Sequence, residues 1–173
     1  GNIDVDAATR NTLSVLEMAG AGPIPVARGC DAPLLAVPGD ARNVHGDDGL
    51  GNTRPPAPKR KPSDEHAVAQ LLRLTHERPG ELTIVATGPL TNLAVALKQD
   101  PELATRVRRL VMMGGAASAP GNRSPVAEFN IAHDPEAAAI VFNAGWRVTM
   151  VGLDVTMKSV LTERHLAQLR AAR

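Results

Sequence analysis

Three short apolar runs restrict the folds open to this 173-residue chain more than any other feature. They are Leu82–Ala86, Arg109–Met113 and Val148–Val151, and a glycine follows each of them within two residues. Nearly continuous apolar runs with β-branched members are typical of strands buried on both faces of a sheet. Helical patterns separate the runs, so crossover helices are expected to join consecutive strands in parallel. This order predicts a single α/β domain over residues 1–173, with a mostly parallel sheet flanked by helices.

Helix start signals support the alternation. The first helix is predicted from about Ala7 to Met18, with Asp4 or Asp6 as its capping residue. Another opens at Asp134, which can cap the helix while the following proline fits the first turn. The other expected elements are helices at roughly Asp64–His76 and Leu90–Lys98, a helix from Thr162 onward, and a short strand at Ile24–Ala27.

Residues 38–62 form a stretch rich in Gly, Pro, Asp and Asn that is too long for a simple connection. A loop of this length in a compact domain is usually functional or unstructured. It contains the basic run Lys59–Lys61, but prolines surround the run. That context indicates a solvated loop rather than a nucleic-acid contact.

Charge and composition argue against nucleic-acid and membrane partners. The formal net charge of +1 gives no electrostatic attraction to a polyanion. No apolar run approaches the length of about 18 residues that a spanning helix requires. The single cysteine, Cys30, cannot form an intrachain disulfide, which favours a reducing, cytoplasmic location.

Polar residues gather where the predicted strands end, and ligands of parallel sheets bind at that edge. Asparagine and glutamate side chains can each make two or more hydrogen bonds to vicinal hydroxyls. This pattern suggests a polyol or sugar ligand, although loops are polar in any case. The polar residues concerned are Thr87, Asn92, Asn122, Glu128, Asn130 and Asp154.

Other ligand classes have less support. The chain contains no phosphate-binding GxxxxGK[ST] motif and no dinucleotide-binding GxGxxG motif. Its five histidines are scattered, and none has the HExxH spacing of a zinc site. A hard cation bound by carbonyl and carboxylate oxygens stays open, but no complete ligand shell is apparent.

Eight short motifs follow one another in a fixed order along nearly the whole chain. They are Gly1-Asn2, Val44–Gly46, Gly49–Gly51, Ala86–Ala94, Val111–Gly115, Pro125–Asn130, Asp134–Ala138 and Val151–Thr156. Together they resemble the inosine-uridine preferring nucleoside hydrolase family. The resemblance implies a Rossmann-like nucleoside hydrolase fold. It also implies hydrolysis of the N-glycosidic bond of ribonucleosides to ribose and free base, in purine and pyrimidine salvage, through an oxocarbenium-like transition state. A homo-oligomer, either dimer or tetramer, is implied as well.

The resemblance assigns substrate contacts to particular residues. Met113 and Phe129 would line the apolar side of the sugar and base, although ordinary core residues would look the same. His45 would face the nucleobase, with a solvated loop histidine as the alternative. Asp154 is better explained as structural. Hydrogen bonds to the ribose hydroxyls are assigned to Asn2, Asn122, Glu128 and Asn130.

The resemblance also implies a bound Ca²⁺ in the complete enzyme, with the backbone carbonyl of Thr87 among its ligands; a simple strand-end turn is the alternative. The family's DxDxGxDD segment, which supplies most calcium ligands and the general base, does not occur in these 173 residues, and neither does its late His-Asp pair. We therefore expect an internal portion of a longer hydrolase, an incomplete domain that contains no catalytic residue and is inactive alone. The alternatives are a truncated, non-catalytic remnant that binds nucleoside or ribose, and an unrelated α/β enzyme that acts on a sugar.

Overall fold

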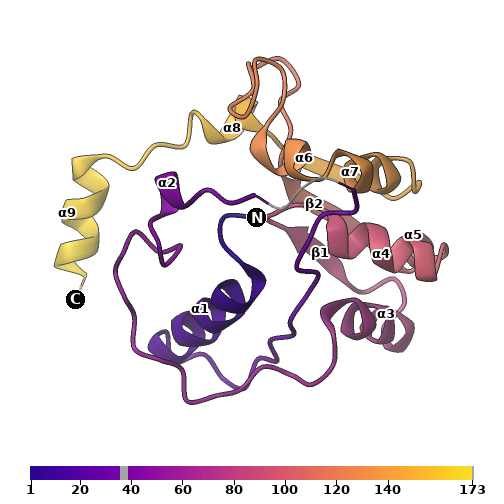
Figure 1. Ribbon diagram of the computed structural model, residues 1–173, viewed down its shortest axis with the longest axis horizontal. Coiled ribbons are helices and arrows are strands. Elements are labelled where there is room, and N and C mark those ends of the chain that lie inside the picture. Colours follow the sequence, from indigo (N-terminus) through magenta and orange to yellow (C-terminus); the bar gives the residue numbers. More distant parts are fainter. Residues whose placement is uncertain (36–38, 173) are drawn as a thin grey trace.

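The computed structural model describes residues 1–35 and 39–172. Three strands form one parallel sheet: β1 (Thr83–Ala86), β2 (Arg109–Met113) and β3 (Val148–Val151). They lie side by side in their sequence order, with β2 in the middle (Figure 1). In the register, Val111 lies opposite Val85 on one side and Thr149 on the other. The predicted parallel α/β architecture is confirmed.

The longer helices also lie where the sequence predicts them. Asp4 caps the first, because its carboxylate accepts the N–H of Ala7 at 2.7 Å. Asp134 caps the helix that begins at Pro135, accepting the N–H of Ala137 at 3.0 Å. These longer helices are α1 (Val5–Met18), α3 (Ala67–Glu77), α4 (Thr91–Gln99), α7 (Pro135–Phe142) and α9 (Glu163–Ala171).

Short helices were not predicted, because four or five residues carry no readable periodicity. They are α2 (Arg42–His45), α5 (Leu103–Arg106), α6 (Phe129–His133) and α8 (Leu153–Thr156). Of the predicted loop at residues 38–62, Pro38 lies outside the described residues, and residues 39–62 contain α2 and no strand.

The predicted strand at Ile24–Ala27 is wrong. Only an isolated parallel bridge forms there, between Ala27 and Ser63. Pro25 has no N–H to donate to a ladder, and Pro23 precedes the run, so an extended ladder is disfavoured.

The hydrophobic core lies between one face of the sheet and the helices α3, α4, α5 and α7. Leu110 and Met112 of β2 are completely buried against this layer. α4 and α7 approach each other through small residues, since Ala94 and Ala137 are both 0% exposed. Trp146 is the buried aromatic of the core, and its Nε1 donates to the carbonyl of Val141 at 2.7 Å. Aliphatic side chains therefore fill most of the core.

The opposite face of the sheet is not covered in the same way, so the expectation of strands buried on both faces is wrong. Alternate residues of a strand point to opposite faces. Val85 is 65% exposed and Thr149 is also exposed, whereas Val111 is half-buried. Among the described residues the core helices pack on one side, and β1 is hydrogen-bonded only to β2.

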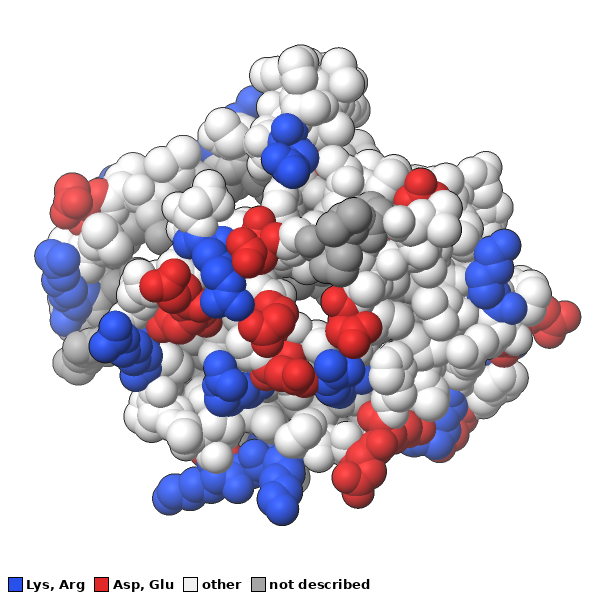
Figure 2. All heavy atoms as spheres, viewed as in Figure 1, with Lys and Arg blue, Asp and Glu red and all other residues white. Residues whose placement is uncertain are grey.

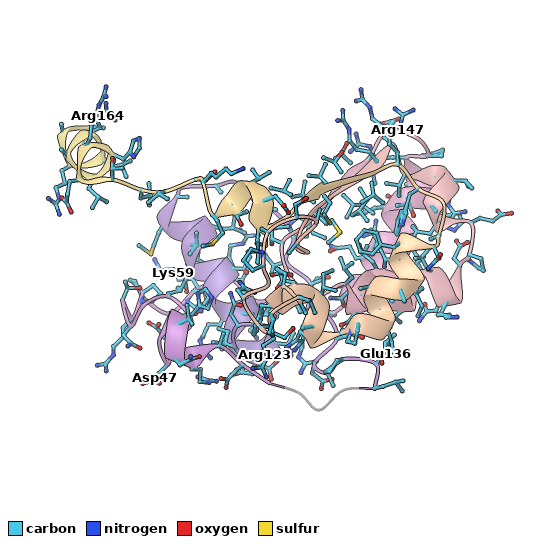
Figure 3. The ribbon with its side chains drawn as sticks, turned by 90° about the horizontal axis from the view of Figure 1, so that it is seen from above. Asp47, Lys59, Arg123, Glu136, Arg147 and Arg164 are labelled. Carbon is cyan, nitrogen blue, oxygen red and sulfur yellow. The ribbon has the colours of Figure 1, made fainter. Side chains whose placement is uncertain are left out.

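Residues 67–156 form what we call the sheet body, and residues 1–35 and 39–66 what we call the N-terminal segment. Figure 1 shows the N-terminal segment as a wide loop beside the sheet body, with α1 enclosed by it. The helix α9, which carries Arg164, stands apart from both in two perpendicular views (Figures 1 and 3). Within residues 1–35 and 39–172, no helix combines the length and the apolar character needed to cross a membrane.

Candidate functional site

Glu128 lies at the carboxyl end of β2, where its carboxylate joins the strand to the next helix. The side chain is buried, and its Oε2 accepts the N–H of Gly115 at 3.0 Å and the N–H of Ile131 at 3.1 Å. The second bond caps α6. Burying a carboxylate is costly unless hydrogen bonds compensate for lost water, and these two donors do so. No hydrogen bond within the described part of the chain engages Oε1, which is left as an acceptor.

Asn130 lies beside Glu128 at the same strand end. It is 7% exposed, and its Nδ2 donates to the carbonyl of Met113 at 3.1 Å. Its Oδ1 makes no hydrogen bond to any described residue, so it is a second acceptor. Gly114 allows the close approach, since a Cβ there would lie 3.3 Å from Glu128 Oε2 and 3.0 Å from Met112 Cε.

The remaining predicted residues of this region are joined through the loop between β2 and α6, residues 114–128, which we call the β2 loop. Asn122 is exposed near its tip, and its Oδ1 accepts the N–H of Phe129 at 2.8 Å. The structure therefore brings together Met113, Asn122, Glu128, Phe129 and Asn130 at one strand end.

Asp154, in the first turn of α8, anchors the outgoing part of the same loop. Its carboxylate accepts the N–H groups of Ala117, Ser118 and Ala119, each at 2.8 Å. These backbone donors favour the charged form and lower the pKa of Asp154 to about 2. All three bonds go to backbone groups of the β2 loop, and the structural role expected for Asp154 stays a prediction.

A cavity of about 360 Å³ lies at the carboxyl end of β1, and Thr87 lines it. Three residues that the sequence did not single out as site residues also line it: Cys30, Asp31 and His133. Burial lowers the pKa of His133 and thereby favours the neutral imidazole. Its ring centroid lies 5.6 Å from that of Phe129. The spacing of four residues on one helix was the signal that could have joined this histidine to the site.

Two side chains hold the segment 30–33, which forms one wall of this cavity. Asn92 Oδ1 accepts the N–H of Cys30 at 2.9 Å. Asp134 is 0% exposed, and its Oδ2 accepts the N–H of Leu34 at 3.0 Å and the hydroxyl of Thr91 at 2.6 Å. The sequence predicts the capping role of Asp134 but not this second role, which depends on contacts distant in sequence.

Asn2 and His45 lie outside the cluster around Glu128. Asn2 lines an adjacent cavity of about 320 Å³, which shares Cys30 and Asp31 with the first. His45 is half-buried at the end of α2 and lines neither cavity. Within the described residues, no hydrogen bond joins Asn2 or His45 to Glu128 or Asn130.

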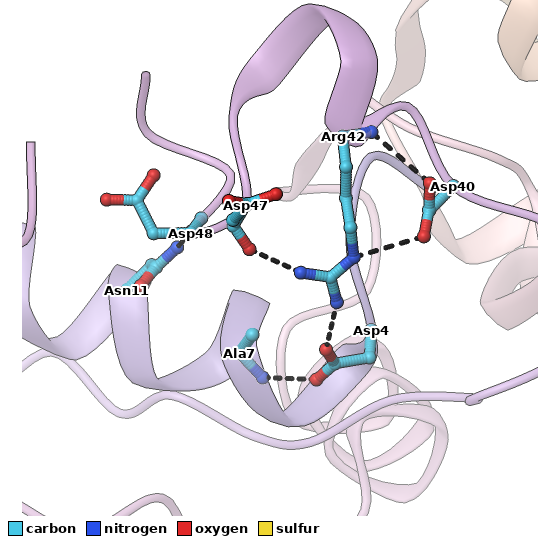
Figure 4. A network of polar contacts seen from close by, with 7 residues as sticks. All are labelled: Asp4, Ala7, Asn11, Asp40, Arg42, Asp47 and Asp48. Atoms are coloured by element: carbon cyan, nitrogen blue, oxygen red, sulfur yellow. Dashed lines mark hydrogen bonds and ion pairs between the residues drawn. The ribbon is translucent and has the colours of Figure 1, made fainter. Parts of the chain in front are cut away.

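An ion network connects α1 to the segment around His45 (Figure 4). The Arg42 guanidinium donates to Asp4 at 2.9 Å, to Asp40 at 3.1 Å and to the carbonyl of Asp47. The N–H of Ala7 and, to a smaller extent, Arg42 lower the pKa of Asp4. Figure 2 shows acidic and basic side chains interleaved on the face in view, without a patch of one sign.

The described residues do not by themselves fit a calcium ion. Calcium in proteins takes about six to eight oxygen ligands. In residues 1–35 and 39–172, no three His, Cys, Asp or Glu side chains come together in a group suited to a metal. Asp31 shares the cavity with Thr87, but its carboxylate is exposed and lies 3.8 Å from the Arg28 guanidinium.

Sequence comparison places this arrangement among known proteins. The sequence model of the inosine-uridine preferring nucleoside hydrolase family matches residues 1–173. The chain is 46% identical over 171 residues to a probable uridine nucleosidase 1 of Oryza sativa subsp. japonica, covering 98% of the chain and 53% of that protein. It is 46% identical over 165 residues to an inosine-uridine preferring nucleoside hydrolase of Leishmania major, covering 94% and 52%. The chain thus spans about half the length of the curated relatives it matches.

Solved structures agree. A purine-preferring ribonucleoside hydrolase from Gardnerella vaginalis superposes with a TM-score of 0.95 at 35% identity, over 99% of this chain and 55% of that one. A plant nucleoside hydrolase, PpNRh1, superposes with a TM-score of 0.83 at 44% identity, over 89% and 49%. These relatives are named for different base preferences: uridine, inosine and uridine, or purines.

Proposed function

Because the chain belongs to the inosine-uridine preferring nucleoside hydrolase family, we propose that the intact polypeptide containing it hydrolyses the N-glycosidic bond of ribonucleosides. The products would be ribose and a free base, in purine and pyrimidine salvage. Residues 1–173 would form one partial domain of that enzyme. The proposal extends to a cytoplasmic location, a homo-oligomer of two or four subunits, and no nucleic-acid or membrane partner.

The observation that carries the proposal is the pair of acceptors at the end of β2. Glu128 Oε1 and Asn130 Oδ1 belong to side chains whose other polar atoms are fixed by Gly115, Ile131 and Met113. Vicinal sugar hydroxyls are donors that match two such acceptors. Because packing and hydrogen bonds already fix both side chains, little rotamer entropy is lost when a sugar binds. This supports ribose binding at Glu128 and Asn130, with Asn122 as a further partner from the β2 loop.

The other residues have proposed roles that follow from their places. Met113 and Phe129 would contact the apolar side of the substrate. Asn2 would reach the ribose from the adjacent cavity, and His45 would meet the nucleobase. His133 could share the base side of the pocket, since it lies against Phe129 and burial favours its neutral imidazole.

Thr87 would offer its backbone carbonyl to a calcium ion only where further oxygen ligands join it, since the described residues do not complete a shell. We assign no proton transfer and no water activation to a residue of this chain. The chain as given is proposed to bind the sugar side of the substrate and to release no base on its own.

The direct test is release of free base from inosine and from uridine by the intact polypeptide with Ca²⁺ supplied, followed by ultraviolet absorbance. Glu128→Gln replaces one carboxylate oxygen by a donor, so it should lower kcat/KM by about 30- to 100-fold, the effect of losing a charged hydrogen bond. Glu81→Gln, on an exposed residue away from the sheet end, is the matched control and should leave kcat/KM unchanged.

Equal kcat/KM for Glu128→Gln and wild type would remove Glu128 from the site. Ribose binding by an intact polypeptide that releases no base would favour the non-catalytic alternative instead. Metal-dependent turnover by the 173-residue chain alone would show that the catalytic groups lie within it.

A further inference from the structure

The β2 loop is fastened at both of its roots by carboxylates, and only one of these belongs to the proposed sugar site. At the end of the loop that leads into α6, the Glu128 carboxylate accepts the N–H of Gly115. At the end of the loop that leaves β2, the Asp154 carboxylate accepts the N–H groups of Ala117 through Ala119. We propose that Asp154 is a positioning residue that sets the place of Asn122 and the β2 loop for sugar binding. This inference rests on the proposed function.

Asp154 lies after β3, whereas the loop that it holds follows β2. The N–H of Leu153 donates to the carbonyl of Gly115 at 2.9 Å. Gly152 permits this contact, because a Cβ at that position would lie 2.8 Å from the carbonyl oxygen of Gly115. The end of β3 is therefore pressed against the end of β2, and α8 presents its aspartate to the loop. The position of the loop is set by the sheet through Asp154.

Hydrogen bonds close the far part of the loop on itself. The N–H of Gly121 donates to the carbonyl of Pro125 at 3.0 Å, and the N–H of Arg123 donates to Ala127 at 3.0 Å. Asn122 lies within this closed tip, and Figure 1 shows the loop (orange) projecting beyond the sheet. Because these bonds tie the tip together, we expect the location of Asn122 to depend on how the two ends of the loop are held.

The carboxylate acts as an acceptor and has no acid–base task in this arrangement. Three N–H donors at 2.8 Å account for both oxygens, Oδ1 with two and Oδ2 with one. They keep the pKa of Asp154 near 2, so the group is ionised throughout the pH range in which such an enzyme would be assayed. An asparagine would retain one acceptor oxygen and place an NH₂ group against a backbone N–H.

The test compares Asp154→Asn and Asp154→Ala in the intact polypeptide, with inosine as substrate and ribose as competitive inhibitor. Looser positioning of the loop should raise KM and the ribose inhibition constant together, by about tenfold for the alanine variant and less for asparagine. The value of kcat should change by less than about threefold. Asp100→Asn is the control, because it alters a hydrogen-bonded carboxylate at the C-terminal end of α4. It should leave both KM and the ribose inhibition constant unchanged.

A lower melting temperature with unchanged KM and unchanged ribose inhibition would mean that Asp154 only stabilises the fold, and it would overturn the inference. If wild-type polypeptide releases no base from inosine or uridine, the proposed function fails first, and the two failures are thereby distinguished. Should both variants fail to fold, amide exchange of wild type decides. Saturating ribose should slow exchange at Ala117–Ala119, and unchanged rates there would overturn the inference.

Discussion

The sheet body and the N-terminal segment are stabilised by different kinds of contact. Leu110, Met112 and Val141 of the sheet body lie in one continuous apolar cluster, in which helices close over a sheet face. The N-terminal segment has a few separate buried side chains, such as Leu13 in α1. Among the described helices, the most extensive packing is between α4 and α7 and between α3 and α4, whereas loop residues surround α1.

Polar bonds take the place of a core in the N-terminal segment. Ser14 donates to the carbonyl of Pro56 at 2.9 Å, and Asn11 donates to the carbonyl of Asp48 at 2.7 Å. Glu17 accepts from the N–H groups of Lys59 and Arg60. Each such bond contributes only about 0.5–1.5 kcal/mol, whereas a buried leucine contributes about 2 kcal/mol or more. The comparison predicts that the sheet body is the more stable of the two regions and that the N-terminal segment depends on its anchors to it.

Matched leucine truncations give the largest expected difference between the two regions. Leu110→Ala should lower the free energy of unfolding by about 3–5 kcal/mol, because strands and helices around it cannot close the cavity. Leu13→Ala should cost about 2–3 kcal/mol, at the low end of such changes, because loop residues can close in. Urea denaturation of the two variants measures both. Equal losses would show that the regions are equally well packed.

The next effect is expected at the junction of the regions. Asp134→Ala leaves the N–H groups of Leu34 and Ala137 and the hydroxyl of Thr91 without their acceptor, which should cost about 3 kcal/mol in unfolding free energy. Amide exchange should also accelerate in the N-terminal segment more than in β2. Asp100→Asn again serves as control. Exchange that rises equally in both regions would contradict a specific anchoring role.

The smallest expected effect is the loss of stability at low pH. The pKa values of Asp4 and Asp48 in the N-terminal segment and of Asp154 beside the sheet are all lowered, chiefly by backbone N–H donors. A lowered folded-state pKa adds stability above the ordinary pKa near 4, and that stability disappears as pH falls through the folded-state value. The Asp154 carboxyl should titrate at about pH 2 by NMR. A midpoint near 4 would contradict the bonds to Ala117–Ala119.

The parts of the fold that follow from local rules could be predicted from the sequence. The strands Arg109–Met113 and Val148–Val151 have the predicted bounds, and Asp134 caps its helix as expected. The exposure of Val85 could not be predicted, because an apolar run does not reveal whether helices cover one face or two. The strand predicted at Ile24–Ala27 does not form, because a strand also needs a partner with free N–H and carbonyl groups.

The candidate site divides in the same way. The joining of Met113, Asn122, Glu128, Phe129 and Asn130 follows from closeness in sequence and from the rule that strand ends carry ligands. The residues that pattern alone did not reveal, Asp31 and His133, reach the cavity from loops and a short helix whose positions depend on long-range contacts. Asn2 and His45 are placed by contacts of that kind too, and their roles stay predictions.

The order β1-β2-β3 has a consequence for synthesis on the ribosome. β2 pairs with β1 and β3 pairs with β2, so neither ladder joins strands that have another strand of this sheet between them in the sequence. As the chain emerges, β2 can pair with β1 once α4 and α5 have been made, and β3 follows after α7. We therefore expect the nascent sheet to grow in one direction, because no strand among these three has to wait for one encoded further downstream.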